Sequence, residues 1–392
     1  METMKYAVLK LSVVLFLHAA TAAASAVVTP NSLHLGSLIA SGNFGSVLWA
    51  THNNKPCVAK HAATDSRAAE YLSVEEEINK LLDERASLYS SVEAHERYIA
   101  PYLGACVKDD RRHLVWQKAG EATLQTYLVG GDRMVLARAL GVDDPLDVPR
   151  RVLHDVLEGL AHAHACGIAH RDVKPENFIV DPTSQTLRLI DFGSACDCAG
   201  WLVRRGLRPD RVPCSVLYMP PEQRIDLSRG PFAYDVYSAA LIWLCAAVPA
   251  LAKDEEALFN LRMELKEHRH DPHAWRDAAD APPAEGFVEV FGWKGDGDNG
   301  DAGDNGMGMS SGNDDAAWER ERAWELLTRM LAYNPSERPG AAEALVGPYI
   351  NRDCKEGELP MPAAEPWSLE GLAAMAGATP RRVVEADECV VM

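Results

Sequence analysis

The segment AHRDVKPENFIVD, Ala169–Asp181, places His, Arg, Asp, Lys, Glu and Asn side by side between two apolar runs. A solvent-exposed loop has no need of so ordered a mixture. A core strand would not tolerate it, because buried charges cost free energy unless they are paired. The segment therefore indicates a functional site. The kind of site has to be inferred from the other residues of the chain.

Length and composition set the first limits. A chain of 392 residues is long enough for two lobes or two modest domains, each with its own core. The net charge of −18 argues against a nucleic-acid partner, because binding a phosphate backbone requires a basic surface. The nine cysteines are scattered, form no CxxC pairs and do not resemble a disulfide framework, so we expect a reducing compartment.

The N-terminus has the layout of a targeting segment. Lys5 and Lys10 precede the apolar run Leu11–Leu17, and small residues follow up to Ala24–Ala26. Positive, apolar and small residues in this order are typical of a cleaved signal peptide. A membrane anchor is the alternative, and either one gives the chain a possible route to membrane association. We interpret residues 1–30 as a signal or targeting segment outside the fold.

Hydrophobic periodicity divides the remainder into a β-rich first part and a helical second part. The patterns predict strands in Leu33–Lys60, His113–Gln117 and Leu187–Asp191, and helices in Ala68–Leu88, Arg150–Cys166, Tyr234–Val248, Ala257–Glu267, Trp318–Tyr333 and Ala341–Val346. This order indicates an α+β fold with a cleft between the two parts.

A Gly/Asp/Asn run at residues 292–315 interrupts the helical part. A calcium loop needs oxygen-bearing side chains at positions 1, 3 and 5, and Gly300 falls on one of those positions in both frames considered, which begin at Asp296 and Asp298. The run is therefore interpreted as a flexible, solvated insertion.

Phosphoryl transfer from ATP needs a phosphate cradle, a cation on the phosphates, metal ligands and a carboxylate that orients the attacking hydroxyl. The sequence supplies all four in one order. Gly42 and Gly45 of IASGNFGSV (Ile39–Val47) lie in a strand-turn-strand, where missing side chains let the backbone approach phosphates. Lys60 follows on the next strand. Glu77 on the following helix is predicted to pair with it in preference to Glu75 or Glu76, because Ile78 and Leu81–Leu82 follow it.

The carboxylates and the amide come later in the chain. The opening segment provides Asp172 and Asn177, and the DFG sequence provides Asp191. HRDVKPEN followed by DFG at this distance is highly specific. On these motifs the chain resembles the eukaryotic protein kinase domain over roughly Leu33–Ile350. KPEN is similar to the serine/threonine type rather than the tyrosine type.

The resemblance implies a bilobal kinase fold, ATP and Mg²⁺ as cofactors, and a protein serine or threonine as substrate. The lobes would span residues 31–118 and 119–352, with the active site between them and a tail at 353–392. Asp172 would orient the substrate hydroxyl or accept its proton, and Lys174 would lie near the γ-phosphate. Asn177 and Asp191 would hold Mg²⁺. The implied nucleotide-binding residues are Ile39, Gly42, Gly45, Val47, Val58, Lys60 and Glu77.

The resemblance also implies structural roles. His170 and Arg171 would brace the catalytic loop, and Asp235 would anchor its backbone. Glu222 of YMPPE would pair with Arg338. The pattern departs from the family at Ala40, where a glycine is usual, and at PPE in place of APE.

The C-terminal half, including LFNLRMELKEHRHDPHAWR, looks like the chloroplast thylakoid kinases of the state-transition type. That likeness implies threonines on photosynthetic membrane proteins as substrates and a plastid location reached through the N-terminal segment. A catalytically weak pseudokinase that acts as a nucleotide-binding scaffold is the competing interpretation.

The segment after DFG predicts how activity is controlled. A phosphorylation switch needs a hydroxyl in mid-loop, but Ser194, Ser215 and Tyr218 all lie near the ends. We therefore predict activity without phosphorylation of this loop, with the Ser215 hydroxyl bracing Asp172. A redox switch at the loop cysteines is a further hypothesis, beside the alternative that they are ordinary small residues. These cysteines are Cys196, Cys198 and Cys214.

The last four residues, Cys389–Met392, match a prenylation signal that would give a cytoplasmic, membrane-associated protein. Prenylation occurs in the cytosol, so the same molecule cannot use both this signal and a secretory one. Acidic residues precede Cys389 where basic ones usually assist membrane binding, which favours the N-terminal address. The sequence predicts no oligomeric state.

Overall fold

The computed structural model describes residues 27–42, 45–64, 66–89, 92–198, 215–225, 230–293 and 311–352. Several predictions fall outside these ranges: the targeting segment up to residue 26, Cys214, most of the 292–315 insertion, and the tail with Cys389. The chain forms two compact units, one from Met1–Glu76 and Pro101–Lys118, the other from Glu77–Ala100 and Ala119–Met392.

The two units confirm the predicted α+β class, since the first is built on a sheet and the second is mainly helical. The second stretch of the first unit ends at Lys118. Residues 77–100, which we assigned to the first lobe, belong instead with the second unit. The reason is that Arg85 of helix α2 (Ser66–Tyr89) donates to the Cys166 carbonyl at 2.8 Å, and helix α3 (Val92–Tyr98) contacts α6 (Val148–Ala165) and β9 (Thr186–Leu189).

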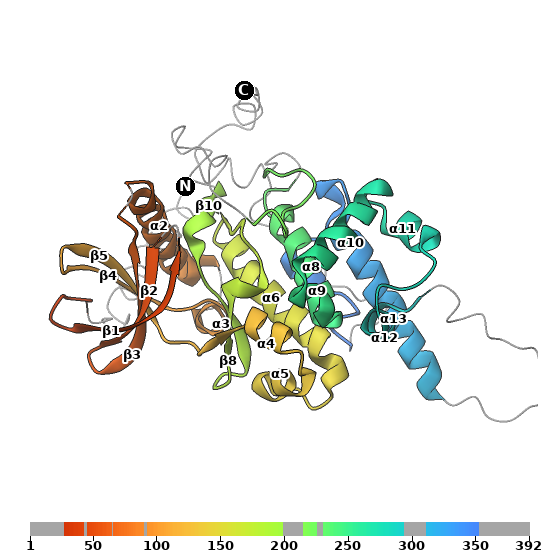
Figure 1. The fold of residues 1–392 in the computed structure, drawn as a ribbon, viewed down its shortest axis with the longest axis horizontal. Helices are drawn as coiled ribbons and strands as arrows, with labels where there is room; N and C mark the ends of the chain where they lie inside the picture. Colours follow the sequence, from red (N-terminus) through yellow and green to blue (C-terminus); the bar gives the residue numbers. More distant parts are fainter. Residues whose placement is uncertain are drawn as a thin grey trace, which may run out of the picture. The chain divides into compact units, whose positions relative to one another are not determined.

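The first unit contains a five-stranded antiparallel sheet in the order β1-β2-β3-β5-β4 (Figure 1). Its strands are β1 (Leu33–Gly42), β2 (Gly45–His52), β3 (Lys55–Ala62), β4 (Tyr102–Lys108) and β5 (Arg111–Gln117). The tight turns β2–β3 and β4–β5 use Asn53–Asn54 and Asp109–Asp110 in the left-handed conformation. Asn and Asp tolerate that conformation better than other side chains, which explains these turns.

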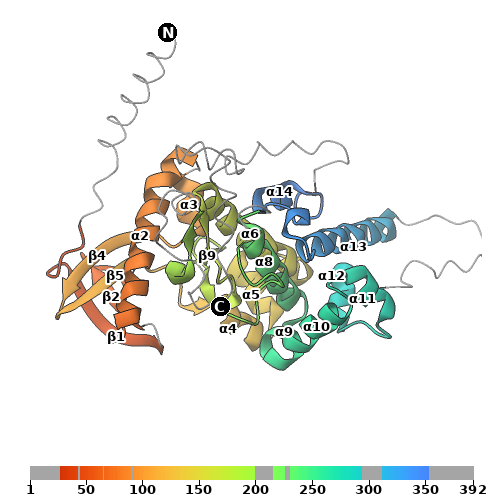
Figure 2. The same cartoon turned by 90° about the horizontal axis from the view of Figure 1, so that it is seen from above.

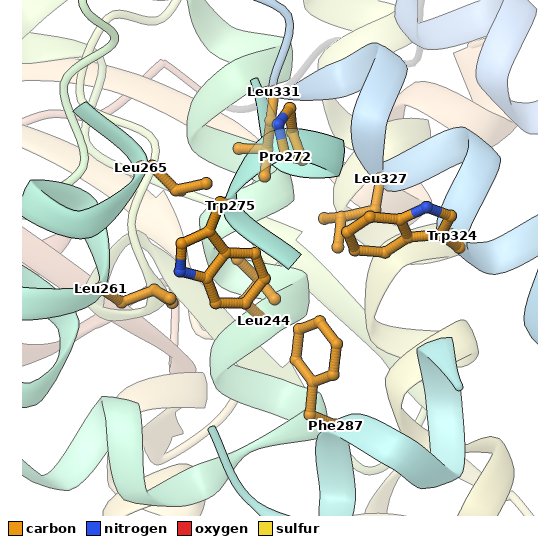
Figure 3. Close-up of a pocket in the computed structure, with 9 residues that line it drawn as sticks. All are labelled: Leu244, Leu261, Leu265, Pro272, Trp275, Phe287, Trp324, Leu327 and Leu331. Carbon is orange, nitrogen blue, oxygen red and sulfur yellow. The ribbon is translucent and has the colours of Figure 1, made fainter. Parts of the chain in front are cut away.

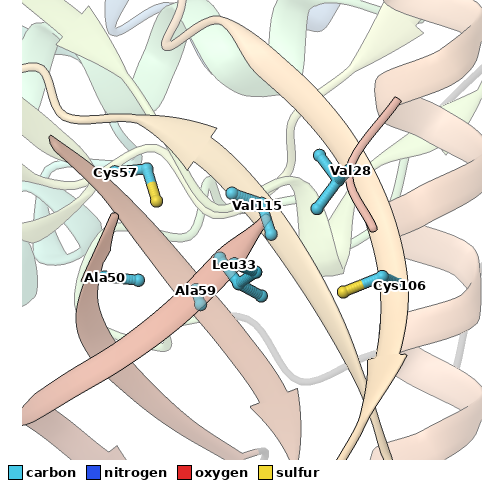
Figure 4. Close-up of a cluster of buried hydrophobic side chains, with 7 residues drawn as sticks. All are labelled: Val28, Leu33, Ala50, Cys57, Ala59, Cys106 and Val115. Carbon is cyan, nitrogen blue, oxygen red and sulfur yellow. The ribbon is translucent and has the colours of Figure 1, made fainter. Parts of the chain in front are cut away.

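Alternation along the strands places small and apolar residues on one face of this sheet. Figure 4 shows the resulting cluster of Val28, Leu33, Ala50, Cys57, Ala59, Cys106 and Val115. Val28 is only 4% exposed, and the Lys108 ammonium donates to the Pro30 carbonyl at 2.8 Å. The expectation that residues 1–30 lie outside the fold is therefore wrong for Val28, because its side chain completes this core.

The second unit is organised around α6 (Val148–Ala165) and α8 (Ala233–Ala247), which lie side by side in Figures 1 and 2. Every residue of α8 is buried, so this helix forms the centre of the unit. The other helices are α4 (Leu124–Gly130), α5 (Arg133–Leu140), α9 (Pro249–Lys253), α10 (Glu255–Glu267), α11 (Pro272–Ala278), α12 (Glu285–Phe291), α13 (Ser311–Met330) and α14 (Ala341–Val346). The short strands are β6 (Ala122–Thr123), β7 (Ile168–Ala169), β8 (Phe178–Asp181), β9 (Thr186–Leu189) and β10 (Cys196–Asp197).

An aromatic cluster joins α10 to α13. Trp275 and Phe287 pack edge to face, and Leu261, Leu265 and Trp324 surround them (Figure 3). The cavity they leave is about 10 Å³, about the smallest that holds one water molecule, so it is a packing gap rather than a ligand site. Among the helices of the described ranges, none combines the length and apolar character of a membrane span.

Candidate active site

The catalytic loop runs from β7 to β8 in the second unit and contains the opening HRDVKPEN sequence. Strand β7 is short because Ala169 is followed at once by the charged residues, and Pro175 begins a single 3₁₀ turn, Pro175–Asn177. His170 is fully buried, and its Nε2 lies 3.0 Å from the Ile190 carbonyl. The loop is therefore fixed to the residue immediately before the DFG sequence.

Asp235 of α8 holds the backbone of this loop, as the sequence predicted. Its Oδ2 accepts from the His170 amide at 2.7 Å, and its Oδ1 accepts from the Arg171 amide at 2.7 Å. His164 Nε2 lies 2.9 Å from the same Oδ2. Arg171 has a φ of +67°, a strained conformation for a long side chain, and these hydrogen bonds maintain it.

Burial and hydrogen bonding act against each other on Asp235. Complete burial alone would raise the pKa of this carboxyl, but hydrogen bonding to His164 and the nearby His170 hold the pKa below its usual value. Asp235 is thus kept charged in the centre of the unit. The sequence analysis missed His164, although a polar residue on the apolar face of α6 was a signal for a buried partner.

Asp172 lies at the centre of the loop among three polar neighbours. The Asn177 amide nitrogen donates to the Asp172 carbonyl at 2.7 Å and to its Oδ2 at 3.1 Å. The Lys174 ammonium lies 2.8 Å from the same Oδ2. Oδ1 accepts from the backbone amide of Ser215 at 2.9 Å, whereas the sequence analysis expected the Ser215 hydroxyl. The carboxylate is therefore held in one orientation by three separate partners.

Asp191 directly follows the strand pair β8–β9 and has an exposed side chain. Its φ of +62° is a left-handed conformation, and its Oδ1 accepts from the Gly193 amide at 3.3 Å. Such backbone outliers concentrate at functional sites. Three residues after Asp191, the Ser194 carbonyl accepts from Arg171 Nε at 2.6 Å, so the catalytic loop also holds the start of the next segment.

The predicted metal ligands have suitable chemistry for Mg²⁺, which prefers oxygen donors from a few side chains. The Asn177 nitrogen is directed at Asp172, which leaves the amide oxygen as the donor for a cation. Asp191 contributes an exposed carboxylate. A hard divalent cation fits this donor set.

Lys60 of β3, in the first unit, pairs with a different glutamate from the one predicted. Its ammonium lies 2.8 Å from Glu75 Oε2, and the Glu75 side chain is 2% exposed. Glu77 lies on the exposed side of α2, so the predicted Lys60–Glu77 pair is wrong. The neighbouring Glu76 accepts from Arg112 at 2.5 and 2.6 Å. Three successive glutamates differ by about 100° each around a helix, and only the helix phase decides which one faces the sheet.

The β1–β2 hairpin and β3 carry the other predicted nucleotide-binding residues. Gly42 pairs with Gly45 across the hairpin, and Val47 pairs with Lys60 across β2–β3. Strand alternation then places Val47, Val58 and Lys60 on one face of the sheet, opposite the buried Cys57 and Ala59. Ile39 is 41% exposed on β1. The hairpin tip, residues 43–44, lies outside the described ranges.

The segment after DFG has two further observations. Glu222 and Arg338 form the predicted pair, with two hydrogen bonds of 2.6 and 2.8 Å. Cys196 and Cys198 are free thiols. Hydrogen bonding between the two thiols lowers the pKa of Cys196 and raises that of Cys198. The redox hypothesis for the loop cysteines stays a prediction, since its third member, Cys214, lies outside the described ranges.

Comparison with known protein families shows to which family the chain belongs. The family model for the protein kinase domain matches residues 33–350. The chain belongs to the protein kinase family. The kinase motifs noted in the sequence are thus parts of one domain.

Two curated relatives come from Arabidopsis thaliana. The chain is 26% identical to the chloroplastic serine/threonine-protein kinase STN7 over 356 residues, 81% of this chain and 57% of that one. It is 27% identical to the chloroplastic kinase STN8 over 291 residues, 64% and 52% of the two chains. The chain thus spans a little over half the length of these relatives. Their names confirm the resemblance to chloroplast kinases.

A solved structure shares the fold. The crystal structure of a Stt7 homolog from Micromonas algae soaked with ATP superposes with a TM-score of 0.62 and covers 84% of this chain and 94% of that one. At 21% sequence identity the likeness shows the fold alone. It confirms the predicted kinase-like fold.

Proposed function

We propose that this chain is an active serine/threonine protein kinase that transfers the γ-phosphoryl group of ATP to protein hydroxyls. The observation that carries the proposal is the environment of Asp172. Its carboxylate is oriented by Asn177, Lys174 and the Ser215 amide, on a loop anchored to the buried Asp235. Family membership supplies the reaction class, and this geometry supports turnover rather than nucleotide binding alone.

In the proposed reaction the substrate hydroxyl attacks the γ-phosphorus as the bond to the β-phosphate oxygen breaks. The hydroxyl proton passes to the Asp172 carboxylate, and ADP leaves with the bonding electron pair. Lys174, held 2.8 Å from Asp172, contributes positive charge beside the transferred group. Lys60, positioned by Glu75, contacts the α- and β-phosphates.

Asn177 and Asp191 are the residues that would hold Mg²⁺. The cation, when bound, neutralises negative charge on the ATP phosphates. Gly42 and Gly45 would let the hairpin backbone approach those phosphates, and Ile39, Val47 and Val58 would contact the base.

The finer proposal concerns the substrate and its location. We infer that threonines on photosynthetic membrane proteins are the acceptors and that the N-terminal segment directs the chain to a plastid. The likeness to two chloroplastic kinases supports this. The suggested prenylation at Cys389 gains no support from these relatives and stays a prediction.

The test is phosphate transfer from labelled Mg-ATP by the purified full chain, beside Asp172→Asn. Casein serves as a general acceptor and heat-treated thylakoid membranes as the specific one, followed by phosphoamino-acid analysis. We expect phosphothreonine and phosphoserine that disappear in the variant. Measurable ATP binding without transfer to either acceptor would instead favour the pseudokinase. Transfer to casein alone would overturn only the proposal about membrane substrates.

A further inference from the structure

Four consecutive carbonyl groups in the segment Val216–Met219 accept hydrogen bonds from side chains. Arg262 of α10 donates from Nη1 to the Val216 and Leu217 carbonyls, both at 2.7 Å, and from Nη2 to the Met219 carbonyl. Ser238 Oγ donates to the remaining carbonyl, that of Tyr218, at 2.8 Å. A guanidinium presents several donors in one rigid fork, which is why one side chain can bind three carbonyls at once.

This segment directly follows Ser215, whose amide donates to Asp172 Oδ1 at 2.9 Å. It forms a turn, closed by a hydrogen bond from the Tyr218 amide to the Ser215 carbonyl, and it belongs to no strand. Side-chain donors therefore satisfy the backbone carbonyls of this segment, which in a sheet would be satisfied by a neighbouring strand. The segment therefore lies directly beside the amide that orients Asp172.

The helix that carries Arg262 is itself fixed. Leu261 and Leu265, on either side of Arg262 in the sequence, enter the apolar cluster with Trp275 in Figure 3. Trp275 Nε1 also donates to Glu264 Oε2 at 3.0 Å. Because Arg262 extends from a helix packed against this cluster, its guanidinium is a fixed point rather than a mobile surface charge.

We propose that Arg262 is a positioning residue for the protein substrate. It holds Val216–Met219 as a preformed platform beside Asp172 in the absence of a phosphate on the loop. The Val216 side chain is 72% exposed while its carbonyl is bound, so the segment has a fixed backbone and a side chain open to a partner. This inference rests on the proposed kinase function and adds the residue that would separate protein recognition from ATP use.

The test compares Arg262→Gln and Arg262→Lys with wild type in the full chain. The measurements are kcat and KM with casein, KM for ATP, and ATP hydrolysis without acceptor. Lys266→Gln is the matched control, because Lys266 is an exposed cation one turn further along α10. We expect Arg262→Gln to lower kcat/KM for casein about tenfold or more, with KM for ATP and acceptor-free hydrolysis within about twofold. Arg262→Lys should recover only part of the lost kcat/KM. The ammonium keeps a charged donor, but it cannot reproduce the fork geometry of the guanidinium.

Amide hydrogen exchange provides a second readout that needs no activity. Residues 215–219 should exchange faster in Arg262→Gln, while α8 stays protected. Unchanged exchange there, or a kcat/KM for casein within about twofold of wild type, would overturn the inference. An equal loss in acceptor-free hydrolysis would also overturn it, because the role would then be general stability. If wild type and Lys266→Gln both fail to phosphorylate casein and heat-treated thylakoid membranes alike, the proposed function fails and this inference fails with it.

Discussion

Two loops carry most of the predicted site residues, and they are stabilised in opposite ways. The β1–β2 hairpin is held by backbone pairing, and most of β1 is exposed. The catalytic loop is held by side chains from other elements, above all by Asp235, which is fully buried. The difference teaches that the hairpin depends on glycines that have no side chain, whereas the catalytic loop depends on hydrogen bonds to particular polar side chains.

The largest effect should come from breaking the anchor of the catalytic loop. Asp235→Asn replaces the carboxylate by an uncharged amide with a single oxygen. Of the two hydrogen bonds from the His170 and Arg171 amides, which use different carboxylate oxygens, one therefore loses its acceptor. We expect kcat to fall about a hundredfold or more and the free energy of unfolding to fall by roughly 3 kcal/mol. Activity assays and urea unfolding would check this. An Asp235→Asn protein with near wild-type kcat would show that the loop keeps its shape without the anchor.

The next comparison separates two glutamates on α2. Glu75→Gln removes the buried partner of Lys60, and we expect kcat/KM for ATP to fall roughly tenfold to a hundredfold. Glu77→Gln is the matched control on the exposed side of the same helix and should change kcat/KM by less than about twofold. If the two variants lost activity equally, the Lys60–Glu75 pairing would not be the functional one.

The hairpin should depend on Gly45 rather than on Gly42. A Cβ at Gly45 would lie 2.1 Å from the His61 carbonyl oxygen, and φ there is +153°, whereas a Cβ at Gly42 meets nothing within 4 Å. We expect Gly45→Ala to cost roughly 2 kcal/mol of unfolding free energy and Gly42→Ala less than about 0.5 kcal/mol. Thermal melting of both variants measures the difference. Equal melting temperatures would mean that the hairpin adjusts without cost.

Acid provides the smallest and most selective probe. The pKa of Asp235 is lower in the folded protein than the usual value of 3.8, so its stabilising effect is present above about pH 4 and is lost as pH falls through the folded pKa. The difference in unfolding free energy between wild type and Asp235→Asn should therefore be constant from pH 7 to pH 5 and narrow below pH 4. The hairpin residues 38–47 contain no titratable side chain. A difference that widened on acidification would contradict this reading of Asp235.

The same contrast explains what the sequence could predict. HRDVKPEN and DFG identified Asp172, Asn177 and Asp191 as a group, and the structure places Asn177 within hydrogen-bonding distance of Asp172. Contacts between distant residues were predictable where family motifs name both partners, as with Glu222 and Arg338. Choosing among consecutive glutamates was not, because a shift of one residue in helix phase moves a side chain to another face.

Other features were not predicted from the sequence. Strand β4 (Tyr102–Lys108) was missed, and so were the short helices α4 and α5, although Thr123 and Asp132 cap their N-termini and Gly131 and Gly141 follow their C-termini. The sequence analysis assigned Val28 to the N-terminal targeting segment, yet its side chain packs in the sheet core of the first unit. Arg262 looked like any surface arginine on an amphipathic helix, because its carbonyl partners lie more than 40 residues away in the sequence.

The most direct test of the account is the rate of phosphate transfer by the full chain after phosphatase treatment, beside Asp172→Asn. Mass spectrometry would establish that residues 191–222 carry no phosphate. The account predicts that the treated wild-type chain phosphorylates casein at its untreated rate and that the variant does not. Loss of transfer on phosphatase treatment would contradict the preformed site, and ATP binding without any transfer would contradict the kinase itself.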